Sequence, residues 1–290
     1  MTTPDDRRNF LRFGGIALAA AGAVTLMEPH QAAAQANSQS LLRTVLGRGH
    51  LIVGTGSTNP PWHFEDDNGK LTGMDIAMAK ILAKGLFDDD TKVDFVQQDP
   101  AARIPNIATG KVDVVIQFMT VTAGRAQQAA FSRPYYIEGV GLLTSPHGKY
   151  KTYKQLLDAG DQVKCAILQN VYAEQLVHQA LPKAQVLQLD TTANSMQAVV
   201  AGRADAVVVD ASTVKWLARK NPGAYADPGH AWGASLYSAA MRQGDPDWHL
   251  WVDTAFNVAM HGDDFPMYSA AFEEFFGTKP PEQVPGYPTF

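Results

Sequence analysis

The stretch ATGKVDVVIQ (residues 108–117) has a near copy further along the chain, VAGRADAVVVD (residues 200–210). Each stretch reads as the end of a helix, a glycine, a basic residue and then an apolar strand that begins after an aspartate. A glycine at that point is typical of a helix that stops, so the likeness also fits a common turn between a helix and a strand. We interpret the repeat as a sign of two lobes of similar build.

Short apolar segments alternate with segments of helical period on both sides of this repeat. Runs such as LIVGT (residues 51–55), without polar alternation, are typical of buried strands in parallel sheets. The alternation predicts an α/β protein with largely parallel sheets. In the first half we expect strands over residues 51–55, 92–97 and 111–118, and helices over 72–86 and 103–110. In the second half we expect strands over 162–168, 184–189 and 204–209, helices over 171–181 and 192–202, and a helical tail over 245–276.

Residues 1–36 have the pattern of a cleaved export signal. A basic start is followed by an apolar run over residues 16–26, too short to span a bilayer, and then by the small residues AQA at 34–36. Arg7 and Arg8 followed by NFL resemble the twin-arginine export motif. We expect a periplasmic protein whose signal peptide is removed. A general secretory signal and a membrane anchor are the alternatives.

The composition excludes several classes of function. The net charge is −5 and there is no basic run, so a nucleic-acid partner is not expected. The single cysteine, Cys165, lies in an apolar stretch and is expected to be a buried small hydrophobe. His63 has no second histidine at a ligand spacing, and the common enzyme motifs are missing from the sequence. We therefore expect a monomer without metal, cofactor or catalysis.

The segment TVTAGR (residues 120–125) follows the strand expected over 111–118 and introduces hydroxyls and a guanidinium. Ligands of open α/β sheets sit at the carboxyl ends of the strands, so we expect Thr120 and Arg125 to line a site. Thr122 is expected to cap a helix whose free N–H groups, with Arg125, suit an anion. The alternative is that Arg125 is a solvated residue at a helix start.

Two further candidates follow apolar strands. Asp210 comes directly after three valines, where its carboxylate would face a cation. The alternative, which the sequence favours, is that Asp210 caps the helix beginning at the next residue. Trp62 follows two prolines after the strand over 51–55, and its ring would line the cleft or pack beneath it.

Several ordered blocks between residues 51 and 277 together resemble the family 3 extracellular solute-binding proteins, the polar amino-acid receptors of ABC importers. The blocks are PPWHFEDDNGKLTGMDIAMAKILAKGL (60–86), RIPNIATGKVDVVIQFMTVTAGRAQQAAFSRPYY (103–136), AGRADAVVVDA (201–211) and RQGDPDWHLWVDTA (242–255). The resemblance implies a two-lobed type II periplasmic-binding-protein fold with a hinged cleft, in which residues 41–138 plus 236–290 form one lobe and 139–235 the other. It also implies that Arg125, helped by Thr120, binds the ligand α-carboxylate, while Asp210 binds the α-ammonium from the second lobe.

The chain departs from the family pattern where the family holds the ligand side chain. The usual residues are an acid, an aromatic lid, its opposing ring, a serine-like residue and a Gly-Thr-Thr segment. The resemblance thus implies that the clamp for the α-groups is kept and the side-chain pocket is rebuilt. This chain has Gly56 in place of the acid, Asn59 in place of the aromatic lid, Pro100 in place of the opposing ring and Phe118 in place of the serine-like residue. The segment that holds Asn170 and Tyr172 stands in place of Gly-Thr-Thr.

The function that these features imply is capture of a small carboxylate, in the first place an amino acid, by lobe closure. The ligand would then be delivered to the membrane permease of an ABC importer. Two alternatives share the fold: a ligand sensor for a partner protein, and a periplasmic dehydratase. A dehydratase needs a general acid, for which Glu174 is the best candidate in the sequence.

Overall fold

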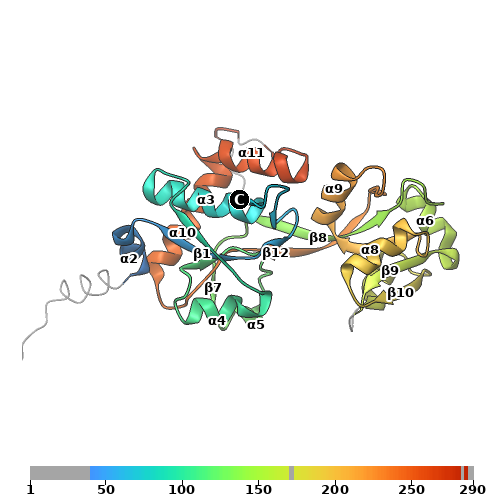
Figure 1. The fold of residues 1–290 in the computed structure, drawn as a ribbon, viewed down its shortest axis with the longest axis horizontal. Helices are drawn as coiled ribbons and strands as arrows, with labels where there is room; N and C mark the ends of the chain where they lie inside the picture. The colour runs from blue at the N-terminus through green and yellow to red at the C-terminus, as the bar shows by residue number, and fades with distance from the viewer. Residues whose placement is uncertain (1–39, 170–172, 282–283, 287–290) are drawn as a thin grey trace, which may run out of the picture. The chain divides into compact units, whose positions relative to one another are not determined.

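The computed structural model of the 290-residue chain describes residues 40–169, 173–281 and 284–286 (Figure 1). The predicted export signal, residues 1–36, and the candidates Asn170 and Tyr172 lie outside the described residues. A search of the described helices finds none that is both long and apolar enough to cross a membrane.

The first sheet has five strands in the order β5-β1-β6-β13-β7. Strands β5, β1 and β6 are parallel, as predicted, whereas β13 and β7 run antiparallel to their neighbours. The prediction of a strand over residues 111–118 is wrong in length, since β6 spans only Val114–Val115. Phe118 does not continue the strand, because its φ is 34° and its N–H bonds to a side chain instead of a neighbouring strand. The strands are β1 (Leu51–Thr55), β5 (Val93–Gln97), β6 (Val114–Val115), β7 (Ala130–Phe131) and β13 (Ala240–Met241).

Helices and a small antiparallel sheet accompany the first sheet. The apolar face expected for the helix over 72–86 is buried, and its side chains Met74, Met78 and Leu82 share one core with Trp248 and Phe256. The helical tail predicted over residues 245–276 consists of two helices, α10 and α11. The helices are α2 (Leu41–Arg48), α3 (Met74–Phe87), η1 (Pro100–Ala102), α4 (Arg103–Ala108), α5 (Ala123–Ala126), α10 (Pro246–His261) and α11 (Phe265–Phe276), and the small sheet is β2 (Thr58–Asn59), β3 (His63–Glu65) and β4 (Leu71–Thr72).

The second sheet has the order β10-β9-β11-β8-β12. Strands β10, β9 and β11 are parallel, and β8 and β12 each run antiparallel to the strand before them in this order. Cys165 is buried as predicted, and burial raises the pKa of its thiol to about 12. The strands are β8 (Tyr136–Thr144), β9 (Lys164–Leu168), β10 (Gln185–Leu189), β11 (Ala206–Asp210) and β12 (Ala231–Tyr237). The helices are α6 (Tyr153–Ala159), η2 (Gly160–Gln162), α7 (Ala173–Ala180), α8 (Thr192–Val200) and α9 (Ala211–Lys220).

Two chain segments connect the two sheets. The chain passes from β7 in the first sheet to β8 in the second, and returns from β12 to β13. These segments hydrogen-bond to each other, from Ser132 N to Ala239 O at 3.0 Å and from Tyr135 N to Tyr237 O at 3.0 Å. The predicted lobe boundaries, at 138/139 and 235/236, fall inside β8 and β12, and they stay a prediction.

Candidate functional site

The loop with Thr120 and Arg125 is closed by its own hydrogen bonds. Arg125 Nη1 donates to the backbone oxygen of Thr120 at 2.7 Å, and Thr122 Oγ1 accepts from Arg125 N at 3.2 Å. The loop is also bonded to the end of β12, since Val121 N donates to Leu236 O and Thr120 forms a bridge with Tyr237. The predicted carboxylate-binding residues are therefore attached to a segment that connects the two sheets.

Arg125 is half-buried, and no carboxylate among the described residues pairs with its guanidinium. A second guanidinium, that of Arg103, is near enough that burial and then the charge of Arg125 lower its pKa. Thr122 caps α5 as predicted, but α5 has only four residues, so a helix dipole adds little to anion binding. The guanidinium itself is the main positive charge that an anion would meet here.

Asp210 ends β11 and occupies the position before α9, but its side chain makes no capping hydrogen bond to that helix. The interpretation of this side chain as a helix cap is therefore wrong. Asp210 is exposed and lies at the surface of a cavity. The surrounding protein still partly desolvates its carboxylate, and this desolvation raises its pKa. Within the described residues it has no ion-pair partner, and it does not contact Arg125. The roles predicted for Arg125, Thr120 and Asp210 stay predictions.

The cavity beside Asp210 has a volume of about 530 Å³ and mostly apolar walls, and we call it the apolar cavity. Asp210 supplies the one charged side chain among its described lining residues. Asn59 reaches the same cavity from the small sheet. The apolar walls include Ile167, Leu176, Met196, Val208 and Leu217.

A second cavity, of about 260 Å³, has polar walls, and we call it the amide chamber. Its lining residues are 56–59, 97–100 and Gln117. It brings together Gly56, Asn59 and Pro100, three of the positions at which the sequence departs from the family pattern. Asn59 lines both the amide chamber and the apolar cavity.

Trp62 is buried, with 2% of its surface exposed, and lines none of the cavities described here. Its ring packs edge-on against Tyr136 and Tyr237, with centroids 4.8 and 5.1 Å away. Its Nε1–H donates to Ser212 Oγ at 3.0 Å, which joins the turn between β2 and β3 to the first turn of α9. A ligand contact of Trp62 stays a prediction.

Asp75 lies at the centre of a buried polar cluster that the sequence analysis did not find. Its carboxylate accepts hydrogen bonds from His63 Nδ1 at 2.7 Å, Tyr135 Oη at 2.7 Å and the backbone N–H of Phe118 at 2.9 Å. The ring of Phe118 stacks on His63 with a centroid separation of 4.7 Å and an interplanar angle of 9°. Phe118 is thus fixed through both its backbone and its ring, two residues before Thr120.

Glu138, on β8, is the second residue that the sequence analysis missed, although an acid inside an apolar strand is a visible signal. Its carboxylate accepts from Ser212 Oγ at 2.5 Å, Ser212 N at 3.2 Å and Gly139 N at 2.9 Å. Burial raises its pKa to about 7, opposed by these bonds and supported by the nearby charge of Asp210. Glu138, Ser212 and Trp62 form one continuous hydrogen-bonded chain.

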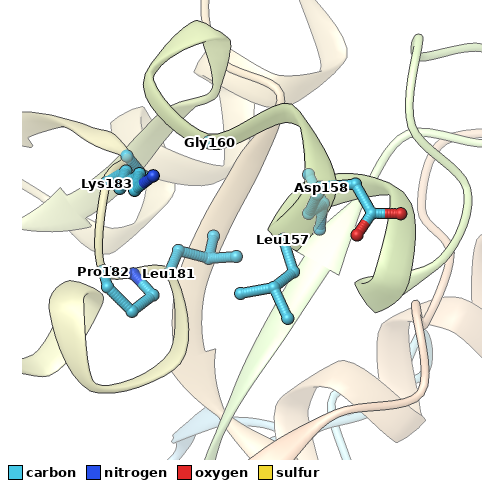
Figure 2. A pocket seen from close by; sticks show the side chains of 8 residues that line it. Leu157, Asp158, Gly160, Leu181, Pro182 and Lys183 are labelled. Atoms are coloured by element: carbon cyan, nitrogen blue, oxygen red, sulfur yellow. The ribbon is translucent and has the colours of Figure 1, made fainter.

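A third cavity, of about 140 Å³, lies between α6 and the turn after α7, where Leu157 and Leu181 point toward one another (Figure 2). No predicted site residue lines it. Glu174, the candidate general acid, is an exposed residue of α7 and lines none of the cavities described here. In the described part of the chain, no three His, Cys, Asp or Glu side chains are grouped so that they could hold a metal ion.

Residues 51–277 match the family described as bacterial extracellular solute-binding proteins, family 3. The L-cystine-binding protein TcyJ of Escherichia coli (strain K12) is 31% identical over 215 residues, which is 72% of this chain and 77% of that protein. The glutamine-binding protein of Geobacillus stearothermophilus is 30% identical over 188 residues, 62% of this chain and 68% of that protein. A solved ancestral cationic amino acid solute binding protein, AncCDT-1, is 33% identical with a TM-score of 0.68, over 82% of this chain and 100% of that one. The predicted two-lobed type II fold is confirmed.

Proposed function

The chain belongs to family 3 of the bacterial extracellular solute-binding proteins, and we propose that it captures an α-amino acid and delivers it to the permease of an ABC importer. The observation that carries the proposal is a pair of unpartnered charges of opposite sign. Within the described residues, the guanidinium of Arg125 and the carboxylate of Asp210 have no ion-pair partner in the protein. Arg125 is half-buried, and Asp210, although exposed, is desolvated enough that its pKa is raised, so each charge would be stabilised by a partner, and a zwitterion supplies one for each.

In this account the ligand α-carboxylate binds Arg125 and the hydroxyl or N–H of Thr120, and the α-ammonium binds Asp210. Thr120 follows β6 of the first sheet along the chain and Asp210 ends a strand of the second sheet, so one ligand would draw both lobes together. The lobes would be residues 41–138 plus 236–290 and residues 139–235, joined by β8 and β12. The closed form would then be the shape that a permease recognises.

We also propose that the protein acts in the periplasm after removal of residues 1–36, and that it binds its solute without converting it. The alternative, a dehydratase, gains no support from Glu174, because that side chain is exposed and outside the cavities described. Replacement of Arg7 and Arg8 by lysine would test the export route, because the twin-arginine pathway requires the pair. The expected result is loss of the protein from the periplasmic fraction.

Thermal melting of the purified protein against the common L-amino acids and small carboxylates tests the binding function. A ligand at about one hundred times its dissociation constant adds about 2.7 kcal/mol, which corresponds to about 5–10 °C for a chain of this size. We expect such a shift with at least one amino acid, and its loss in Arg125→Ala. Arg43→Ala is the matched control, because Arg43 is exposed on α2.

A shift that survives Arg125→Ala would contradict the proposed clamp. A shift with carboxylates that lack an amine, but with no amino acid, would overturn the amino-acid function and the role of Asp210 together. If no compound in the screen changes the melting temperature, the amino-acid function itself is wrong.

A further inference from the structure

The amide chamber is lined mainly by neutral polar side chains, and its described walls contain no cation. The walls carry amides at Asn59, Gln97, Gln98 and Gln117, and one carboxylate, the exposed Asp99. A volume of about 260 Å³ is smaller than a typical drug-sized pocket and suits one ligand side chain. The chemistry of these walls therefore decides which side chain the chamber can hold.

Two of the wall amides, Gln98 and Gln117, are held in fixed orientations by a chain of hydrogen bonds. Asn106 Nδ2 donates to Gln98 Oε1 at 2.6 Å, and Gln98 Nε2 donates to Gln117 Oε1 at 3.1 Å. Gln117 Nε2 then donates to the backbone oxygen of Gln98 at 3.0 Å. Each amide nitrogen has a second N–H and each amide oxygen a second lone pair, so the chain leaves both donors and acceptors for a ligand. Gln117 is 1% exposed, which fixes it further.

The position of Gly56 has no room for a side chain. A Cβ atom on Gly56 would lie 2.6 Å from His63 Cδ2 and 3.1 Å from Gln117 Nε2. The ring of His63, held by Asp75, and the amide of Gln117 therefore occupy the space that an acidic side chain would need. No buried carboxylate is therefore present among the described lining residues of the chamber to stabilise a cationic ligand side chain.

Arg103 makes a cationic side chain still less favourable. Its side chain is 7% exposed, its Nε donates to Pro100 O at 2.9 Å, and its Nη1 donates to Gln117 O at 3.0 Å. The guanidinium thus lies behind two residues of the chamber wall, where it repels a cation. Asp99 on the same wall repels an anion. A neutral ligand side chain avoids both penalties.

We infer that the amide chamber receives the ligand side chain, and that this side chain is uncharged and both donates and accepts hydrogen bonds, as a primary amide does. The inference rests on the proposed function, since the α-groups must be held outside the chamber by Arg125 and Asp210. Asn59, which lines both cavities, lies where the side chain would enter.

Isothermal titration with four L-amino acids of similar length tests the inference: glutamine, glutamate, lysine and methionine. We expect glutamine to bind at least about tenfold more tightly than the other three, because each of those leaves wall amides unpaired or faces a like charge. Gln98→Leu and Gln117→Leu should each weaken glutamine binding by about tenfold and leave methionine binding little changed. Gln179→Leu, on the exposed face of α7, is the matched control.

Gln98 is only half-buried, whereas Gln117 is buried, so we expect Gln98→Leu to fold even if Gln117→Leu does not. Gln98→Leu then provides the test by itself. Tighter binding of lysine, glutamate or methionine than of glutamine, with dependence on Arg125, would overturn this inference and leave the proposed function intact. Preference for methionine in particular would place the side chain in the apolar cavity. Absence of binding by every amino acid would overturn the proposed function and this inference together.

Discussion

Phe118 is a bulky residue with a φ of 34°, a conformation that costs an L-residue free energy and is uncommon outside functional sites. Two contacts offset that cost: the hydrogen bond from its N–H to Asp75 Oδ2 and the stacking of its ring on His63. Phe118 lies after the end of β6 and two residues before Thr120. The Asp75 cluster therefore fixes the residue from which the loop with the predicted clamp begins.

The substitution Gly56→Ala tests whether the side chains of His63 and Gln117 pack as closely around Gly56 as the distances indicate. The added Cβ would lie 2.6 Å from the His63 ring, so the ring or the glycine backbone must shift. We expect the free energy of unfolding to fall by about 1–3 kcal/mol, the usual range for overpacking. Urea unfolding measures this loss.

Gly223→Ala is the control for this substitution, since a methyl group added to Gly223 would meet no atom within 4 Å and the residue has no positive φ. Equal unfolding free energies for the two variants would show that the space beside His63 is not closed.

Sequence reasoning selected Thr120, Arg125 and Asp210 because they lie at or soon after the ends of apolar strands, which are visible in a sequence, and their ligand roles stay predictions. It could not locate the Asp75 cluster. His63, Phe118 and Tyr135 are 12, 43 and 60 residues from Asp75 along the chain, and only the packing of α3 against the loops brings them together. The Gln98–Gln117 pair was hidden for the same reason, since it depends on β5 and β6 both pairing with β1.

Among the elements, β8 combines a connecting role with a buried acid. Glu138 lies two residues after the start of β8 and bonds to Ser212 at the beginning of α9, which in turn accepts from Trp62. Charged groups around Glu138 include Asp210, and the phenols of Tyr136 and Tyr237 are close. The carboxyl therefore titrates in surroundings that favour its neutral form.

The pKa of Glu138 predicts that stability falls as the pH rises from about 4.5 to about 7. In that range the folded protein keeps a proton that the unfolded chain has lost, so folding becomes less favourable with increasing pH. The whole effect is on the order of 3 kcal/mol. Asp210, whose pKa is also raised, acts in the same direction.

Glu138→Gln should flatten this part of the stability profile, because an amide keeps the geometry and cannot ionise. Chemical unfolding at pH 5, 6 and 7 measures the slope. Glu274→Gln, on an exposed part of α11, should retain the wild-type slope. A Glu138→Gln protein with an unchanged slope would show that another group controls the profile in this range.

On the scale of the whole molecule, the strand and helix alternation predicted two α/β sheets in the right chain order. The antiparallel strands β8, β12 and β13 were not predicted, since their pairing joins segments from distant parts of the chain. These strands are the ones that connect the sheets and hold the Thr120 loop. The same pairing explains why the lobe boundaries are harder to read from the sequence than the elements within each lobe.

We propose that a single amino acid bridges Arg125 and Asp210 with its two α-groups. Isothermal titration of the wild-type protein and of Asp210→Asn with L-glutamine and with glutaramate, which is glutamine without its α-amine, tests it directly. Removal of the amine should weaken binding to the wild type by about tenfold or more and change binding to Asp210→Asn little, because the two losses remove the same interaction. An equal loss in both proteins would show that Asp210 does not bind the α-ammonium and would contradict the clamp.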